Sequence, residues 1–179
     1  FQYGLALPAL LFGIPLLVDM LKQKKSPGGL PVRDPAFLCL GLSPIVFAAG
    51  GILGLFVDGT DTRTPAHYHG VIAGINLSFM GLFYGLILPL LDRELERGKA
   101  LYAQIYMFGG GQLVACIGLF LAGGYGTPRK TAGESQGLEE IGAKIGMYMN
   151  GIGALIAVIG GIMFIWMVSK ALIKDSKSA

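Results

Sequence analysis

Long apolar stretches alternate along this chain with short polar connections. Five stretches reach the length of about 20 residues that a helix needs to cross a bilayer. They lie at residues 3–21, 36–57, 66–91, 102–124 and 145–169. Charged residues are almost confined to the connections and the chain ends. The pattern predicts an all-α integral membrane protein, with a single transmembrane domain over residues 1–179 and five membrane-spanning helices.

The composition excludes an ordinary soluble domain. Hydrophobic residues make up 53% of the chain and charged residues 14%, whereas about a quarter of a soluble domain is charged. The net charge of +3 is small, and the basic residues cluster at segment ends. We therefore expect no nucleic-acid partner.

The basic residues also predict the orientation of the helices. Because the number of crossings is odd, the two termini lie on opposite sides of the membrane. Ten basic residues fall on one side, namely Lys22, Lys24, Lys25, Arg33, Arg93, Arg97, Lys99, Lys170, Lys174 and Lys177. Four fall on the other side, namely Arg63, Arg129, Lys130 and Lys144. By the positive-inside rule, the N-terminus is outside, the C-terminus is cytoplasmic, and the third helix starts at the outer surface.

Small and polar residues recur inside the predicted helices. Four pairs of glycines are spaced four residues apart: Gly50 and Gly54, Gly70 and Gly74, Gly81 and Gly85, and Gly142 and Gly146. This spacing lets helices, or a large flat cofactor, approach closely, and close helix packing is the favoured interpretation. Four polar residues within the apolar stretches are expected to hydrogen-bond neighbouring helices: Asn76, Ser78, Gln112 and Asn150.

Both histidines of the chain lie at the start of the third apolar stretch, in the segment TPAHYHGVIAGINLSFMG. His67 and His69 are two residues apart, which on an α-helix is about 200° around the axis and about 3 Å along it. They cannot chelate one ion from one helix, but each can bind a different partner. Two interpretations stay open at this point: interfacial histidines, one solvated and one bonded to a carbonyl, or two haem ligands.

The same segment resembles the tenth helix of subunit I of the haem-copper oxidases. Upstream, IPLLVDMLKQ is similar to the end of the eighth helix, and FAAGGILGLFVDGTDT to the ninth helix and its outer loop. Downstream, LAGGYGTPRK resembles the family's LSGMPRRY, and the next helix is similar to the twelfth. The resemblance covers essentially the whole chain, in order. It implies five helices equivalent to helices eight to twelve of subunit I, in a bacterial plasma (inner) membrane.

The resemblance implies specific roles for several residues. His67 would be the axial ligand of a high-spin haem where O2 is reduced to water, and His69 an axial ligand of the low-spin haem that supplies electrons. Tyr68, at the position of a family phenylalanine, would lie between the two haems. Arg129 and Lys130 would hold haem propionates, although PRK taken alone favours a solvated loop. The implied enzyme is a cytochrome c or quinol oxidase, with proton translocation coupled to electron transfer.

The resemblance also implies partners, because it covers only the last five helices of subunit I. The copper ligands and the second low-spin haem ligand lie on earlier helices in the family. A partner membrane chain would therefore supply those helices and hold the copper, alongside other oxidase subunits and an electron donor, cytochrome c or quinol. Two alternatives are a nitric oxide reductase with non-haem iron in place of copper, and a non-catalytic paralogue in a respiratory membrane complex.

Two acidic residues complete the set of candidates. Asp61 lies in the outer loop where the family binds magnesium, but GTDTR has no histidine, so we expect no magnesium site there. Asp19 aligns with a proton-conducting lysine of the family and is a candidate proton relay. An ion pair of Asp19 with Lys22 or Lys24 is the favoured interpretation.

Overall fold

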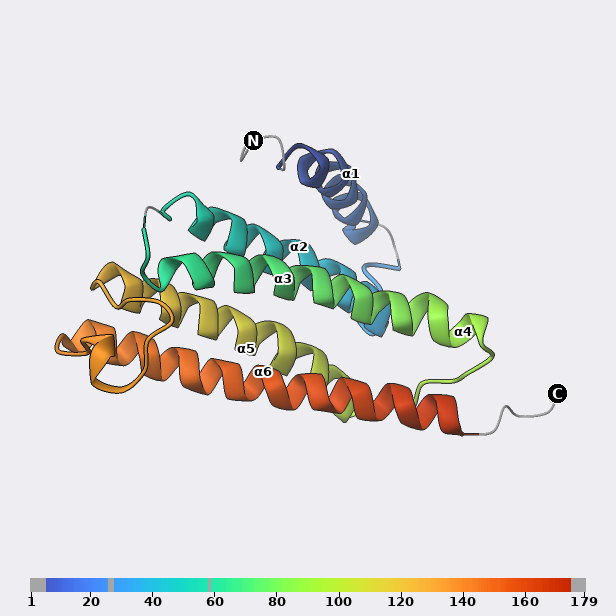
Figure 1. The fold of residues 1–179 in the computed structure, drawn as a ribbon. Helices are drawn as coiled ribbons and strands as arrows, with labels where there is room; N and C mark the ends of the chain where they lie inside the picture. Colours follow the sequence, from blue (N-terminus) through green and yellow to red (C-terminus); the bar gives the residue numbers. More distant parts are fainter. Residues whose placement is uncertain (1–5, 26–27, 58, 175–179) are drawn as a thin grey trace.

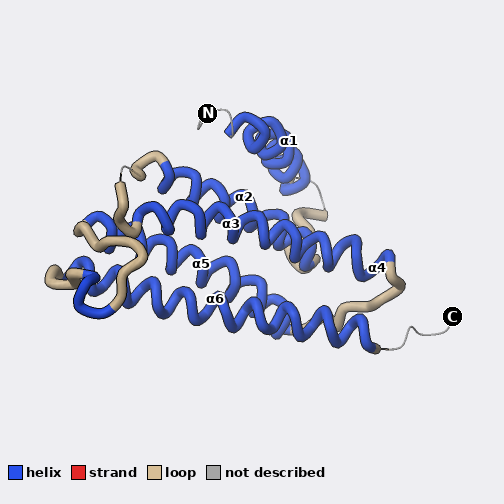
Figure 2. Tube along the Cα trace, viewed as in Figure 1, coloured by secondary structure: helices blue, strands red, loops and turns tan. Residues whose placement is uncertain are grey.

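The computed structural model describes residues 6–25, 28–57 and 59–174, and this part of the chain is helical without β-strands (Figures 1 and 2). The elements, in chain order, are α1 (Ala6–Lys24), α2 (Pro35–Gly54), α3 (Arg63–Leu82), the π-helical turn η1 (Phe83–Ile87), α4 (Leu88–Leu90), α5 (Lys99–Gly124), the 3-10 turn η2 (Gly133–Gln136) and α6 (Ile141–Ile173). α3, η1 and α4 follow one another without a break. The predicted all-α architecture is confirmed.

Within the described residues, four segments are long and apolar enough to cross a membrane: Pro35–Gly54, Arg63–Leu90, Lys99–Gly124 and Ile141–Ile173. They correspond to four of the five predicted crossings. α1 occupies the place of the first predicted crossing, whose expected start at residue 3 lies outside the described residues. A membrane crossing by α1 stays a prediction.

Local sequence signals set the ends of several helices. Asp34 caps α2, because its Oδ1 accepts a hydrogen bond of 2.9 Å from the Phe37 amide, and Pro35 occupies the first turn, where a missing N–H costs nothing. At the far end of the α3 segment, η1 comes just before Pro89, and the Leu88 amide bonds to the Phe83 carbonyl. A π-helical turn is one way in which a helix adapts around a proline.

Glycines bring α2 and α3 together as an antiparallel pair. A Cβ added at Gly50 would lie 2.6 Å from the Gly70 carbonyl carbon, and one at Gly74 would lie 2.7 Å from the Phe47 amide nitrogen. The pair stays close along its length, since a Cβ at Gly81 would lie 2.9 Å from Cys39. The prediction that these glycines serve helix packing is confirmed.

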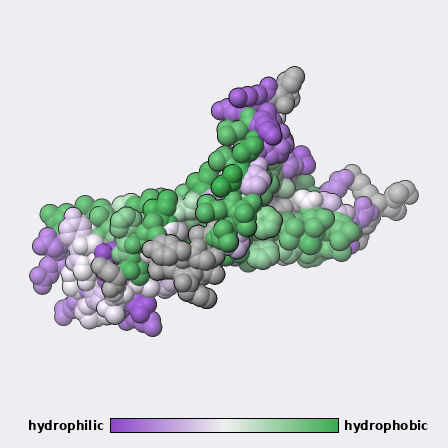
Figure 3. All heavy atoms as spheres, turned by 90° about the horizontal axis from the view of Figure 1, so that it is seen from above, coloured by the Kyte–Doolittle hydropathy of each residue, from purple (hydrophilic) through white to green (hydrophobic). Residues whose placement is uncertain are grey.

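α5 and α6 form a second antiparallel pair that is packed in the same way. A Cβ at Gly118 would lie 2.5 Å from the Asn150 amide nitrogen, and one at Gly153 would lie 2.5 Å from that of Ala115. α3 and α5 join the two pairs through a core that includes Leu77, Leu101 and Ile105. α1 lies apart from this four-helix bundle and projects from it (Figures 1 and 3).

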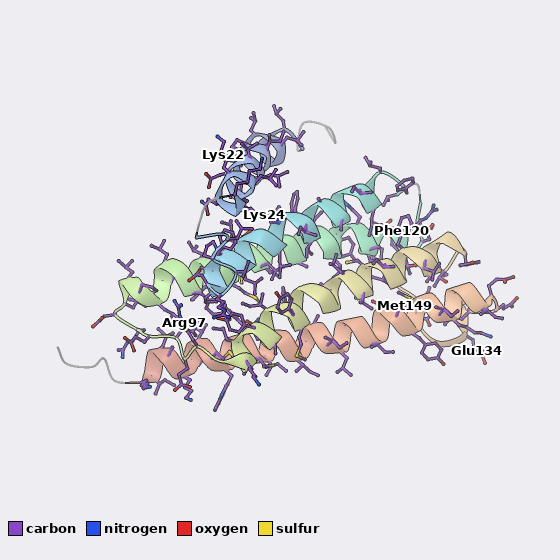
Figure 4. The ribbon with its side chains drawn as sticks, turned by 180° about the vertical axis from the view of Figure 1, so that it is seen from behind. Lys22, Lys24, Arg97, Phe120, Glu134 and Met149 are labelled. Carbon is purple, nitrogen blue, oxygen red and sulfur yellow. The ribbon has the colours of Figure 1, made fainter. Side chains whose placement is uncertain are left out.

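The alternating helix directions give the bundle two distinct ends. At the first, which we call the histidine end, α2 and α5 end and α3 and α6 begin. The opposite end, the basic end, carries the predicted inner basic residues Arg33, Arg93, Arg97, Lys99, Lys170 and Lys174, while Lys22, Lys24 and Lys25 lie at the end of α1 that leads to it; Lys177 lies outside the described residues. Figure 4 shows Arg97 toward the basic end, Lys22 and Lys24 on the projecting α1, and Glu134 at the histidine end. The two ends match the predicted charge asymmetry, whereas the side of the membrane that each end faces stays a prediction.

Candidate functional site

His67 lies in the second turn of α3, on the side that faces α2. It is half-buried, and its Nδ1 lies 2.8 Å from the carbonyl oxygen of Gly50. A carbonyl oxygen can only accept, so Nδ1 carries the proton and donates. In the neutral ring, the lone pair is then on Nε2, which is the arrangement found in metal-ligating histidines held by a backbone carbonyl.

Glycines of α2 make the space that the His67 ring occupies. A Cβ at Gly54 would lie 2.4 Å from His67 Nδ1, so no larger residue fits there without moving the ring. One turn earlier, Gly50 packs directly on Gly70 and thereby brings its own carbonyl within reach of the imidazole. The α2–α3 contact therefore both accommodates and orients His67.

His69 and Tyr68 project from the other side of α3. Both side chains are exposed, and their ring centroids lie 4.9 Å apart with the planes inclined by 37°. His69 makes no hydrogen bond to any residue that the structure describes. The two histidines thus point in different directions, as their spacing predicts, and Tyr68 lies between them around the helix axis.

The described residues contain no cluster of three or more histidine, cysteine, aspartate or glutamate side chains that could hold a metal ion. Because His67 and His69 point in different directions, each could act as a single ligand of a separate group. An axial position on a porphyrin iron needs only one imidazole from a helix.

The loop after α5 brings Arg129 and Lys130 to the start of α3. The Arg129 amide donates to the Thr60 carbonyl at 3.0 Å, and the Thr62 amide donates to the Thr127 carbonyl at 3.0 Å. The side chain of Arg129 is half-buried and that of Lys130 is exposed, and neither forms an ion pair with a described residue. Lys130 also has a φ of 63°, a left-handed conformation that costs free energy for a residue with a side chain.

Asp61 and Arg63 fix the connection that precedes α3. The Asp61 carboxylate accepts hydrogen bonds from Arg63 Nη2 at 2.7 Å, from Arg63 Nε at 3.0 Å and from the Arg63 amide at 2.8 Å. These bonds, first of all those from the side chain, hold the pKa of Asp61 below its usual value. A carboxylate already engaged in this way is a poor magnesium ligand.

The favoured ion pair of Asp19 is wrong. Asp19 Oδ2 instead accepts a hydrogen bond of 2.8 Å from Gln23 Nε2, and it pairs with neither Lys22 nor Lys24. Helix geometry excludes Lys24, which lies about 140° away from Asp19, whereas Gln23 and Lys22 both lie on its face; nothing in the structure explains the choice of Gln23 over Lys22. The alternative role as a proton relay stays a prediction.

The intramembrane polar residues divide into two groups. Ser78 bonds to Ser43 of α2 at 2.5 Å, as predicted for a contact between neighbouring helices. Asn76, Gln112 and Asn150 make no hydrogen bond with described residues, so a bond from each of them to a neighbouring helix stays a prediction.

A further polar contact was not anticipated from the sequence. The Tyr84 hydroxyl donates to Gln104 Oε1 at 2.6 Å, and Gln104 Nε2 lies 3.5 Å from Met80 Sδ. The sequence does show Gln104 as a polar residue near the start of an apolar helix. Its partner Tyr84 on η1 could be identified only from the packing of the two helices.

Comparison with known proteins gives two relatives and no function. No family model matches the chain. The uncharacterized protein RP382 of Rickettsia prowazekii (strain Madrid E) is 33% identical over 137 residues, which is 71% of this chain and 26% of the relative. An uncharacterized protein of Aquifex aeolicus (strain VF5) is 33% identical over 84 residues, 47% of this chain and 19% of the relative. The chain therefore spans about a quarter or less of the length of the curated relatives that it matches.

Proposed function

We propose that this chain is the haem-binding part of subunit I of a haem-copper-type terminal oxidase, with His67 ligating the high-spin haem and His69 the low-spin haem. The observation that carries the proposal is the geometry at His67. Its Nδ1 is held by the Gly50 carbonyl, which leaves Nε2 as the ligating atom. His69 supplies a second imidazole from the same helix, on the exposed side and without a partner among the described residues.

The residues present fit two haems better than one shared ion. One helix that bears both imidazoles fixes the directions in which they point, and with them the relative placement of the two haems. The interpretation as two interfacial histidines predicts the same contact between His67 and a carbonyl, so the two interpretations differ only in what Nε2 of His67 and the ring of His69 bind. Haem content decides between them.

Arg129 and Lys130 are suited to bind the carboxylates of these haems. The loop that carries them is bonded to the segment just before α3, at the same end of the bundle as both histidines. No described acidic residue competes for either cation. A haem propionate there would gain charge-assisted hydrogen bonds. The left-handed backbone at Lys130 supports this role, because strained conformations cluster at functional sites.

The haems would supply the one-electron chemistry and, with a copper ion held by a partner chain, the reduction of O2 to water. This chain's residues would bind and orient: His67 and His69 set ligand direction, and Tyr68 separates the two haems. The second ligand of the low-spin haem and the copper ligands would come from further membrane-spanning helices. In both relatives, chain beyond the matched region makes up most of the length, which is room enough for such helices.

Histidine substitutions test the proposal. The complex is purified through a tag on this chain, and dithionite-reduced minus oxidised spectra are recorded with and without carbon monoxide. His69→Ala is expected to abolish the low-spin band, and His67→Ala mainly to remove carbon monoxide binding at the other haem. Tyr68→Phe is the matched control and should keep both signals. Loss of one and the same band in both alanine variants, or unchanged spectra, would contradict the assignment.

The identity of the metal beside the high-spin haem separates the oxidase from a nitric oxide reductase. Elemental analysis of the same purified complex would find copper in the first case and additional non-haem iron in the second.

A further inference from the structure

We infer that the exposed face of α3 around Asn76 is covered by membrane-spanning helices of a partner, whereas the outward face of α6 contacts lipid. The partner helices would be apolar overall and would carry a hydrogen-bonding group opposite Asn76. The inference requires that α3 spans the membrane, and it does not require that either histidine binds haem.

Asn76 lies near the middle of the bilayer. It comes 13 residues after the start of α3, which corresponds to about 20 Å along a helix, within a hydrocarbon layer of about 30 Å. Its side chain is exposed and bonds to no described residue. A carboxamide that faces hydrocarbon loses its hydrogen bonds to water and gains none in return. A stable protein therefore covers it.

The same stripe of α3 carries a second polar side chain. His69 lies seven residues before Asn76, which is two turns and nearly the same direction from the axis, and it is exposed as well. The apolar residues beside them, Ile72 and Phe79, are also exposed. Asn76 therefore lies deep in the bilayer on an exposed stripe that carries a second polar side chain nearer the start of α3, and a purely lipid-facing surface avoids such a stripe.

α6 offers the contrast within the same molecule. Its outward positions recur at spacings of four and three and are exposed and apolar between its two ends: Ile145, Tyr148, Ile152, Leu155, Ile159, Ile162 and Trp166. The tyrosine and the tryptophan lie toward the two ends of the helix, where aromatic side chains suit the membrane–water boundary. This face needs no protein partner.

A partner chain fits the α3 face better than a second copy of this chain. A second copy would present the same stripe, and about a two-fold axis along the membrane normal each polar group would meet residues at its own depth on the other copy. The two relatives instead have most of their length beyond the region that they share with this chain. Membrane-spanning helices formed by further chain of this extent are the occupant that we infer for the α3 face.

Site-directed spin labelling tests the inference at matched depth. Ile75→Cys lies beside Asn76 on α3, and Leu155→Cys is the control on α6; both positions are exposed and lie about 20 Å along their helices. The native Cys39 and Cys116 are buried, and the parent protein measures any labelling of them. Collision of each nitroxide with O2, which concentrates in lipid, is measured by EPR in the tagged complex and in this chain reconstituted alone.

In the complex, we expect O2 accessibility at Ile75→Cys to be several-fold lower than at Leu155→Cys, and to rise to a similar level in the chain alone. Equal accessibility in the complex would show that lipid covers α3 and would overturn the inference. Protection of Ile75→Cys in the chain alone would identify a second copy as the occupant and would also overturn it. Optical spectra of the same samples measure haem content independently of O2 accessibility. If they show that the histidines bind no haem, the accessibility at Ile75→Cys still tests whether helices cover α3.

Discussion

At the residue scale, the spacing of His67 and His69 predicted that their side chains point in different directions, but it could not predict which group orients the His67 ring. A helix places residues two apart in nearly opposite directions, whatever surrounds it. The carbonyl that orients His67 belongs to Gly50, 17 residues earlier. No local pattern joins the two residues, because their contact depends on how closely α2 and α3 pack.

The glycine beneath His67 gives a test of this orientation. Gly54→Ala places a methyl group where its carbon would lie 2.4 Å from Nδ1, so the imidazole must turn away from the Gly50 carbonyl. We expect carbon monoxide binding at the high-spin haem to fall strongly, while the low-spin band from His69 is retained.

Gly51→Ala is the control for that substitution, since a Cβ there meets nothing within 4 Å. It should leave both signals unchanged. Equal behaviour of the two alanine variants would show that the position of His67 does not depend on the space at Gly54.

At the element scale, the helices themselves were readily predicted, and their ends were not. The apolar stretch at 145–169 continues as a helix from Ile141 to Ile173, past Lys144 and Lys170. Apolar windows find only the part of a helix that lies in hydrocarbon, whereas backbone hydrogen bonding continues beyond it. The same reasoning explains why α5 begins at Lys99, before the predicted residue 102.

Spacing of small residues predicted close packing but not which helices are paired. Gly146, Gly153 and Gly160 repeat every seven residues along α6, and all three face α5. Which residue of α5 each glycine contacts depends on how the connection between α5 and α6 turns the chain back, and the spacing does not contain this information. Asp19 shows the opposite case, since its partner lies on the same helix and could have been found by choosing the residue four positions on.

The α5–α6 contact predicts a position-dependent cost of adding a side chain. Gly118→Val would place its Cβ 2.5 Å from the Asn150 amide nitrogen and the same distance from the Gly146 carbonyl oxygen. Since backbone atoms cannot turn aside, we expect a loss of about 2 kcal/mol or more in stability. A lower midpoint of thermal unfolding in detergent would report it.

Gly110→Val provides the comparison on the same helix. A Cβ at Gly110 meets nothing within 4 Å, so the two variants share the change in helix propensity and differ only in packing. Similar unfolding temperatures for both variants would argue against close packing of α5 on α6.

At the scale of the whole molecule, the two ends of the bundle differ in charge and in how they are held together. At the basic end, loop residues reach across to the end of α6: Glu96 pairs with Lys170 at 2.8 Å, and Arg93 bonds to the Lys174 carbonyl. The histidine end is held instead by backbone bonds between the connections that precede α3 and follow α5. The overall charge asymmetry could be predicted by counting, whereas these cross-links required the arrangement of all four helices.

The charge asymmetry predicts which end faces the cytoplasm, and labelling of two loops tests it. Glu134→Cys lies in η2 at the histidine end, and Glu94→Cys lies at the basic end; both positions are exposed. With basic residues retained inside, a membrane-impermeant maleimide should label Glu134→Cys in spheroplasts and Glu94→Cys only in inverted vesicles. The reverse pattern would place His67 and His69 near the cytoplasmic surface and would invert the side from which electrons and protons reach the proposed haems.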